Sequence, residues 1–143
     1  MSGRTEGLCF IDTNIWLYAF IASQDERKHA IAKQIIKEVE IAVSVQIINE
    51  VVVNLLKKAS VGESEIQRLI KSFYSNYPVL GLDERSLILA SELRQTYQFS
   101  FWDSLIIANA LEAGASFLMT EDMQNGMEIK GNLKIVNPFI DSA

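Results

Sequence analysis

The chain has 143 residues, of which 49% are hydrophobic and 22% charged, and its formal net charge is −5. This length and composition indicate a single globular domain spanning residues 1–143, which can bury roughly two thirds of its unfolded surface, and they argue against disorder. One cysteine, Cys9, excludes an internal disulfide, and one histidine, His29, leaves no ligands for a zinc cluster and little room for a nucleophilic site based on histidine.

The apolar start of the chain does not fit a secretory signal. Arg4 precedes an apolar segment at residues 8–22, but Asp12 and Asn14 interrupt that segment, and the later apolar runs are too short to span a membrane. We therefore expect a cytoplasmic protein. Its negative charge provides no overall basic surface, so binding of nucleic acid would require a local concentration of Lys and Arg.

Short apolar runs alternate with amphipathic runs along the chain, which predicts strands alternating with helices. The predicted strands span residues 8–11, 41–43, 79–82, 116–119 and 133–136. The predicted helices span residues 15–22, 25–39, 46–58, 84–97 and 100–114, with one more that begins after a capping box at Ser60 and Glu63 and ends near residue 74. This order predicts an α/β fold with a parallel sheet of five strands and helices on both faces.

Four acidic side chains fall near one edge of this sheet. Asp12 ends the first strand, Asp122 follows the fourth, Glu50 lies one turn into the helix after the second strand, and Asp103 lies in the first turn of the helix before the fourth. Because the carboxyl ends of parallel strands meet at one edge, where ligands of open α/β sheets bind, we expect these carboxylates to converge.

Each acid also has a purely structural explanation. Asp12 could simply cap the next helix, and Asp103 has capping-box spacing with Ser100. Glu50 belongs to a polar stripe, with one residue every four, that could face water. Four acids at equivalent edges, in a chain without catalytic His or Cys, nevertheless favour a common function.

Converging carboxylates repel one another, so they raise a pKa or bind a cation, and their hard oxygens suit Mg²⁺ or Mn²⁺. Such an ion can activate water and offset phosphodiester charge, which fits a metal-assisted nuclease. The glycines at 62, 81 and 114 are isolated, so there is no glycine-rich nucleotide loop. An alternative is a phospho-accepting Asp12, as in receiver domains or haloacid-dehalogenase-like phosphatases, although Asn14 stands where a second acid would be expected nearby.

Four segments, FIDTNIWLYAF, SVQIINEV, FWDSLIIANAL and LMTEDMQNG, resemble in order and spacing the acidic motifs of PIN-domain ribonucleases, particularly the VapC-like toxins of bacterial toxin-antitoxin pairs. The resemblance implies a three-layer sandwich around a five-stranded parallel sheet. It also implies an endoribonuclease that depends on Mg²⁺ or Mn²⁺ and is often a homodimer, together with a small antitoxin that masks the site.

Matched residue by residue, the resemblance implies four catalytic acids that ligate metal and two polar residues that hold their carboxylates. The acids are Asp12, Glu50, Asp103 and Asp122, and the polar residues are Asn14 and Thr120. Relatives with a similar last motif commonly have His where this chain has Asn125. Glu121 would point away from Asp122 on an extended chain, so we leave it outside the expected site.

An acidic chain that binds RNA needs a local cationic surface. Helix 25–39 carries Arg27, Lys28, Lys33 and Lys37, which we expect to contact RNA, although a solvated helix face would look the same. The antitoxin implied by the resemblance would place a basic side chain, best an Arg, among the acids. The alternative function from another class is a non-catalytic PIN-like module that only binds RNA or protein.

Overall fold

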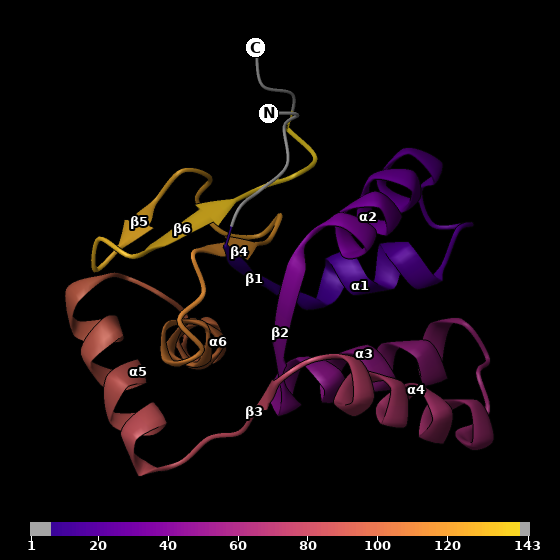
Figure 1. The fold of residues 1–143 in the computed structure, drawn as a ribbon, viewed down its shortest axis with the longest axis horizontal. Coiled ribbons are helices and arrows are strands. Elements are labelled where there is room, and N and C mark those ends of the chain that lie inside the picture. Colours follow the sequence, from indigo (N-terminus) through magenta and orange to yellow (C-terminus); the bar gives the residue numbers. More distant parts are fainter. Residues whose placement is uncertain (1–6, 141–143) are drawn as a thin grey trace.

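A single sheet of six short strands runs through the computed structural model, which describes residues 7–140 (Figure 1). The strands are β1 (Leu8–Ile11), β2 (Glu40–Ser44), β3 (Val79–Leu80), β4 (Phe117–Met119), β5 (Glu128–Ile129) and β6 (Leu133–Val136). The helices are α1 (Thr13–Phe20), α2 (Glu26–Glu38), α3 (Val45–Lys58), α4 (Glu63–Asn76), α5 (Glu84–Thr96) and α6 (Phe101–Glu112). In Figure 1, α5 and α6 lie on one side of the sheet and α1 to α4 on the other, so the predicted α/β three-layer sandwich is confirmed.

The predicted strand count and the purely parallel sheet are wrong. The strand order is β3-β2-β1-β4-β6-β5, and β5 pairs antiparallel with β6 while the other pairings are parallel. The extra strand has only two residues, too few to show a period, and a tight turn with Lys130 and Gly131 at positive φ returns the chain to β6. Burial of Ile129 holds this short edge in place.

Helix starts follow local capping chemistry, with one exception to the predictions. Ser44 caps α3 by accepting from the backbone N–H of Ile47, and Asp83 forms a full capping box with Ser86 at the start of α5. The capping box predicted at Ser60 is wrong, because α4 starts at Glu63 after Gly62, without a side-chain cap.

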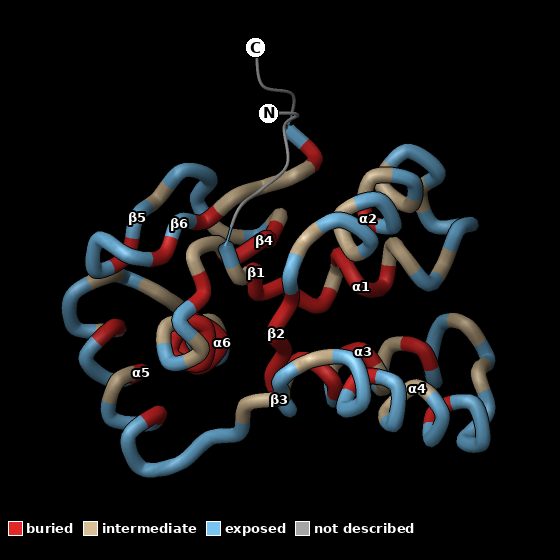
Figure 2. Tube along the Cα trace, in the orientation of Figure 1, coloured by how far each residue is buried: buried red, intermediate tan, exposed pale blue. Residues whose placement is uncertain are grey.

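The core lies along β1, β2 and α6, which are buried over most of their length (Figure 2). Cys9 is fully buried in β1, as expected, and burial raises the pKa of its thiol to about 11, so it is unreactive at neutral pH. Trp16 of α1 is buried on the other side of the sheet from α6. Its indole N–H donates to the Ile11 carbonyl at 3.0 Å, and its ring packs edge-on against the ring of Phe73 at a centroid distance of 5.0 Å.

The ends of β1 and β4 lie side by side at one edge of the sheet. The backbone N–H of Asp12 donates to the Met119 carbonyl at 2.9 Å, and that of Thr120 donates to the Val136 carbonyl at 3.0 Å. The order of strands along the chain reverses direction at β1, with β2 on one side and β4 on the other. Ligands of open α/β sheets bind outside the strand ends at such a switch point.

Of the helices between residues 7 and 140, none combines the length and apolar character that crossing a membrane requires.

Replacement of Gly7 by Ala is expected to lower the thermal unfolding midpoint by more than replacement of Gly126. Gly7 has φ +100°, and a Cβ there would lie 2.6 Å from Ser116 Oγ, whose residue is tied to β1 by a hydrogen bond to the Leu8 carbonyl. Gly126 has φ +88° with open space around it, so Gly126→Ala costs only the left-handed backbone, roughly 1–2 kcal/mol. Thermal melts followed by circular dichroism compare the two variants, and equal shifts would show that Ser116 moves aside.

Candidate functional site

Asp12 is the most constrained of the acids. It follows β1 and caps α1, with Oδ1 accepting from the Thr13 backbone N–H and Oδ2 accepting from the Thr120 hydroxyl, both at 2.8 Å. Only 7% of the residue is exposed. Burial raises the pKa of Asp12 to about 6 despite these hydrogen bonds, and Asp103 and Glu50 add to the rise. Asp12 therefore caps α1 and also lies close to the other acids.

Glu50 reaches the same region from α3. Its Oε1 accepts from the Thr13 hydroxyl at 2.6 Å, and its Oε2 accepts a longer bond of 3.4 Å from Gln46 Nε2. Asn54, one turn further on, donates to the Glu50 carbonyl at 2.8 Å. The polar stripe of α3 thus faces the acids and is half-buried, so the alternative that it simply faces water is wrong.

Asp122 and Asp103 approach from the opposite side. The Thr120 hydroxyl, which donates to Asp12, also accepts from the Asp122 backbone N–H at 3.2 Å, and Asp122 Oδ2 accepts from Asn14 Nδ2 at 3.1 Å. Burial, Glu121 and Asp103 together raise the pKa of Asp122. The backbone N–H of Asp103 donates to the Ser100 hydroxyl at the start of α6, while its carboxylate makes no hydrogen bond with the described residues.

All four acids line one cavity of about 350 Å³ at the ends of β1 and β4. Its other lining residues are Thr13, Asn14, Asn54, Trp102 and Ile106. Within residues 7–140, no three acidic, His or Cys side chains are placed closely enough to form a ready metal site. The four carboxylates therefore share one cavity, as expected, but they are spread around its wall.

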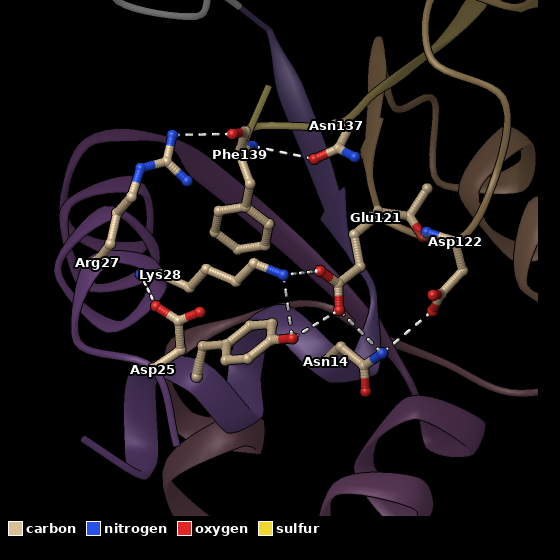
Figure 3. Close-up of polar contacts among 10 residues, drawn as sticks. Asn14, Asp25, Arg27, Lys28, Glu121, Asp122, Asn137 and Phe139 are labelled. Atoms are coloured by element: carbon tan, nitrogen blue, oxygen red, sulfur yellow. Dashed lines mark hydrogen bonds and ion pairs between the residues drawn. The ribbon is translucent and has the colours of Figure 1, made fainter. Parts of the chain in front are cut away.

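Glu121 contributes more to this region than the sequence indicates. Its carboxylate accepts from Lys28 Nζ at 2.7 Å, from the Tyr18 hydroxyl at 2.8 Å and from Asn14 Nδ2 at 3.3 Å (Figure 3). The chain bends after β4 and does not stay extended, so Asn14 can bridge the carboxylates of Glu121 and Asp122. No pattern in one sequence links these distant residues.

The four predicted RNA-contacting cations of α2 differ in their surroundings. Lys28 is bound to Glu121 and lies about 5 Å from the rings of Tyr18 and Phe139. Arg27 donates to the Phe139 carbonyl at 2.9 Å, so it fastens the C-terminal segment to α2 (Figure 3). Lys33 and Lys37 are exposed and line a separate cavity of about 700 Å³ beside α1.

Asn125 has a structural contact outside the acidic cavity. Its Oδ1 accepts from the Asn137 backbone N–H at 2.8 Å, and the Asn137 side chain in turn accepts from the Phe139 backbone N–H at 3.0 Å. These bonds shape the turn after β6.

Comparison with known proteins gives a match to the PIN domain family over residues 9–124. Among solved structures, a toxin-antitoxin complex from Klebsiella pneumoniae is similar with a TM-score of 0.68 and 24% identity, covering 92% of this chain and 98% of that one. VapC20 of Mycobacterium tuberculosis, a toxin described as cleaving the sarcin-ricin loop, has a TM-score of 0.63 and 17% identity, covering 77% and 86%. VapBC2 of Rickettsia felis bound to a promoter DNA fragment has a TM-score of 0.61 and 20% identity, covering 91% and 99%.

No curated protein matches the chain. The three solved structures named above are less than 25% identical to the chain, so they support the fold alone. The family match covers most of the sequence, including its first three acidic motifs and the acid of the fourth. The chain belongs to the PIN domain family.

Proposed function

We propose that this protein is a divalent-metal-dependent endoribonuclease and the toxin of a toxin-antitoxin pair. The observation that carries the proposal is the cavity lined by Asp12, Glu50, Asp103 and Asp122 at the switch point of the sheet. The similarity to a toxin described as cleaving the sarcin-ricin loop, and to a toxin-antitoxin complex, supports it. We further infer a cytoplasmic protein that forms a homodimer.

The donor set fits a hard divalent cation. It consists of carboxylate oxygens, and the raised pKa of Asp12 reflects a buried negative charge that nearby acids oppose. We infer that Asp12, Asp103 and Asp122 bind Mg²⁺ or Mn²⁺, with Glu50 binding directly or through water. The carboxylate of Asp103 is half-buried and makes no hydrogen bond with the described residues, so this side chain can adjust to a ligand at little cost. When bound, the ion activates water and offsets the charge of the phosphodiester.

The residues around the acids hold them in place for this chemistry. Thr120 and the Thr13 backbone N–H fix both oxygens of Asp12, while the Thr13 hydroxyl orients Glu50 toward the cavity, where Glu50 can position the attacking water. Asn14 donates to Asp122 and limits its rotation. Rigid placement of this kind is what an in-line displacement requires.

We infer that the partner is a small antitoxin whose basic side chain, best an Arg, enters the acidic cavity. A guanidinium can bind a carboxylate through two parallel hydrogen bonds and would compete with metal for the same oxygens. The cavity volume of about 350 Å³ can accommodate such a side chain.

Asp12→Asn and Asp103→Asn are each expected to reduce RNA cleavage by at least about 100-fold, because a weakened metal site forfeits several kcal/mol of transition-state stabilisation. Asp83→Asn is the matched control, since it makes the same chemical change at a helix N-cap outside the cavity, where Asn caps as well as Asp. Cleavage of a labelled RNA is measured with Mn²⁺ and with chelator. Full activity of both cavity variants, or activity in chelator, would refute the proposed function.

Without metal, wild-type stability is expected to fall as pH rises from about 4 to 7. The pKa of Asp12 rises from its ordinary 3.8 to about 6 on folding, so the folded state holds the proton more tightly, and the gain in stability is complete below pH 3.8 and lost as pH rises through 6. The loss is on the order of 3 kcal/mol. Asp12→Asn removes it, so the difference in unfolding free energy between the two proteins should change with pH.

The same pair of proteins tests the metal. At pH 7, Mn²⁺ should raise the stability of the wild type more than that of Asp12→Asn, because only the wild type keeps the full ligand set. Chemical denaturation at several pH values measures both effects, and a pH-independent difference with equal metal shifts would remove Asp12 from the metal site.

Charge reversal of Lys33 and Lys37 should weaken RNA binding and flatten its salt dependence, because each lost phosphate contact lowers the slope by about one. Both side chains are exposed on α2 and line the cavity beside α1. Reversal of Lys57 and Lys58 at the end of α3 changes the net charge equally and serves as the control. RNA binding is measured over a range of salt concentrations, with both pairs of charge reversals made in the Asp12→Asn background. If the dependence of binding on salt has the same slope for both pairs, α2 does not contact the RNA.

A further inference from the structure

A second cavity of about 630 Å³ adjoins the acidic one. It lies among the start of α3, the segment after β3 and one side of α6, and Glu50 and Trp102 line both cavities. Its remaining lining residues are Val45, Gln46, Asn49, Leu80, Gly81, Leu82 and Asn109. We call it the side cavity. A nucleotide next to a phosphate in the acidic cavity would therefore have the side cavity within reach.

Two of the side chains that line the side cavity carry an amide oxygen that is buried and has no hydrogen-bond partner among residues 7–140. These oxygens are Gln46 Oε1 and Asn109 Oδ1. Asn109 itself is only 1% exposed. Rotating either amide by 180° would not satisfy its oxygen, because the oxygen would then face the acceptors to which the nitrogen now donates. Asn109 Nδ2 donates to the Gly81 carbonyl at 3.0 Å and to Glu112 at 3.1 Å, and Gln46 Nε2 donates to Glu50 and to the Trp102 carbonyl.

An unpaired buried acceptor is costly, so two of them beside one cavity indicate a ligand that brings hydrogen-bond donors. The rest of the wall is mainly apolar, with Val45, Leu80 and Leu82, and Trp102 is 62% exposed at the boundary between the cavities. A ligand that suits this wall has flat apolar faces and a polar edge. An unpaired nucleobase has this form, and single-stranded RNA is recognised by stacking on aromatic rings with hydrogen bonds to base edges.

A purely apolar partner, such as the side chains of another protein surface, fits less well, because it would bring no donor to either oxygen. The bonds of Gln46 Nε2 to Glu50 and Trp102 are long, at 3.4 and 3.3 Å. This amide can therefore turn at small cost and uncover its buried oxygen to a base in the cavity.

We propose that the side cavity binds an unpaired nucleobase of the RNA, adjacent to the phosphate in the acidic cavity, and that Gln46 and Asn109 determine which base is preferred; this rests on the proposed ribonuclease function. Guanine presents two neighbouring donor groups, its N1–H and 2-amino group, whereas adenine and cytosine present one amino group and uracil one N–H. Two acceptors without donors therefore favour guanine, and uracil is bound most weakly.

The test uses the four nucleosides, which lack phosphate and need neither metal nor cleavage. Trp102 is exposed and the other tryptophan, Trp16, is buried, so nucleoside binding is followed by tryptophan emission in chelator. Dissociation constants are taken from saturation, since bases differ in how strongly they quench. We expect guanosine to bind tightest and uridine weakest, and the response to vanish in Trp102→Phe.

Gln46→Met tests specificity with little change of volume. Loss of one acceptor should weaken guanosine binding roughly three- to tenfold and leave uridine binding less affected. Asn109→Leu removes the other acceptor but also strands the Gly81 carbonyl, so the Gln46 variant decides the result if Asn109→Leu fails to fold. Equal dissociation constants for all four nucleosides, or an unchanged guanosine-to-uridine ratio in Gln46→Met, would overturn the proposal.

Two further measurements separate this inference from its alternatives. Trp102 emission that changes with protein concentration, and not with nucleosides, would assign the surface to contact between copies of the chain and would overturn the base site. Asp12→Asn should bind nucleosides as the wild type does. Base-selective binding without any metal-dependent cleavage would refute the ribonuclease and leave the base site standing, whereas cleavage that depends on the acids but ignores the neighbouring base would refute the base site alone.

Discussion

The hydrogen bond from the Thr120 hydroxyl to Asp12 Oδ2, at 2.8 Å, is the interaction on which the site depends. It joins the ends of β1 and β4, because the same hydroxyl accepts from the Asp122 backbone N–H while the strands are paired by the Asp12 to Met119 bond. Loss of the hydroxyl would leave a buried carboxylate oxygen without a donor and release the segment that carries Asp122. One residue thus sets the position of two acids from different strands.

The cavity keeps its acids ionisable at a cost to stability. Asp12 is buried next to other carboxylates, and its raised pKa near 6 shows that hydrogen bonds only partly offset desolvation. Thr13 limits this cost efficiently, since its backbone N–H binds Asp12 while its hydroxyl binds Glu50. A buried carboxylate that destabilises the fold is typical of a site that binds a cation or performs chemistry.

The sequence predicted the sheet edge and its acids because strand ends and helix starts follow from short-range chemistry. Asp12 ends an apolar run, and Asp103 and Glu50 lie near helix starts, so all three could be placed from a few neighbours each. Contacts between distant segments could not be placed in this way. The pair between Lys28 and Glu121 joins positions 93 residues apart. Strand β5 depends on a turn with Lys130 at positive φ, a conformation that a lysine in the sequence does not predict.

The contact of Lys28 with Glu121 changes how the positive charge of α2 acts. A lysine on a helix face would ordinarily be a free cation for phosphate, but this ammonium is already bound to a carboxylate and lies over the rings of Tyr18 and Phe139. It therefore offsets the negative charge of Glu121. Glu121 raises the pKa of Asp122, and the charge of Lys28 acts against that rise. Asn14 donates to both carboxylates and so joins the Lys28 pair to an acid of the cavity. The lysines of α2 therefore have two roles. Lys28 is paired with an acid, whereas Lys33 and Lys37 are exposed to solvent.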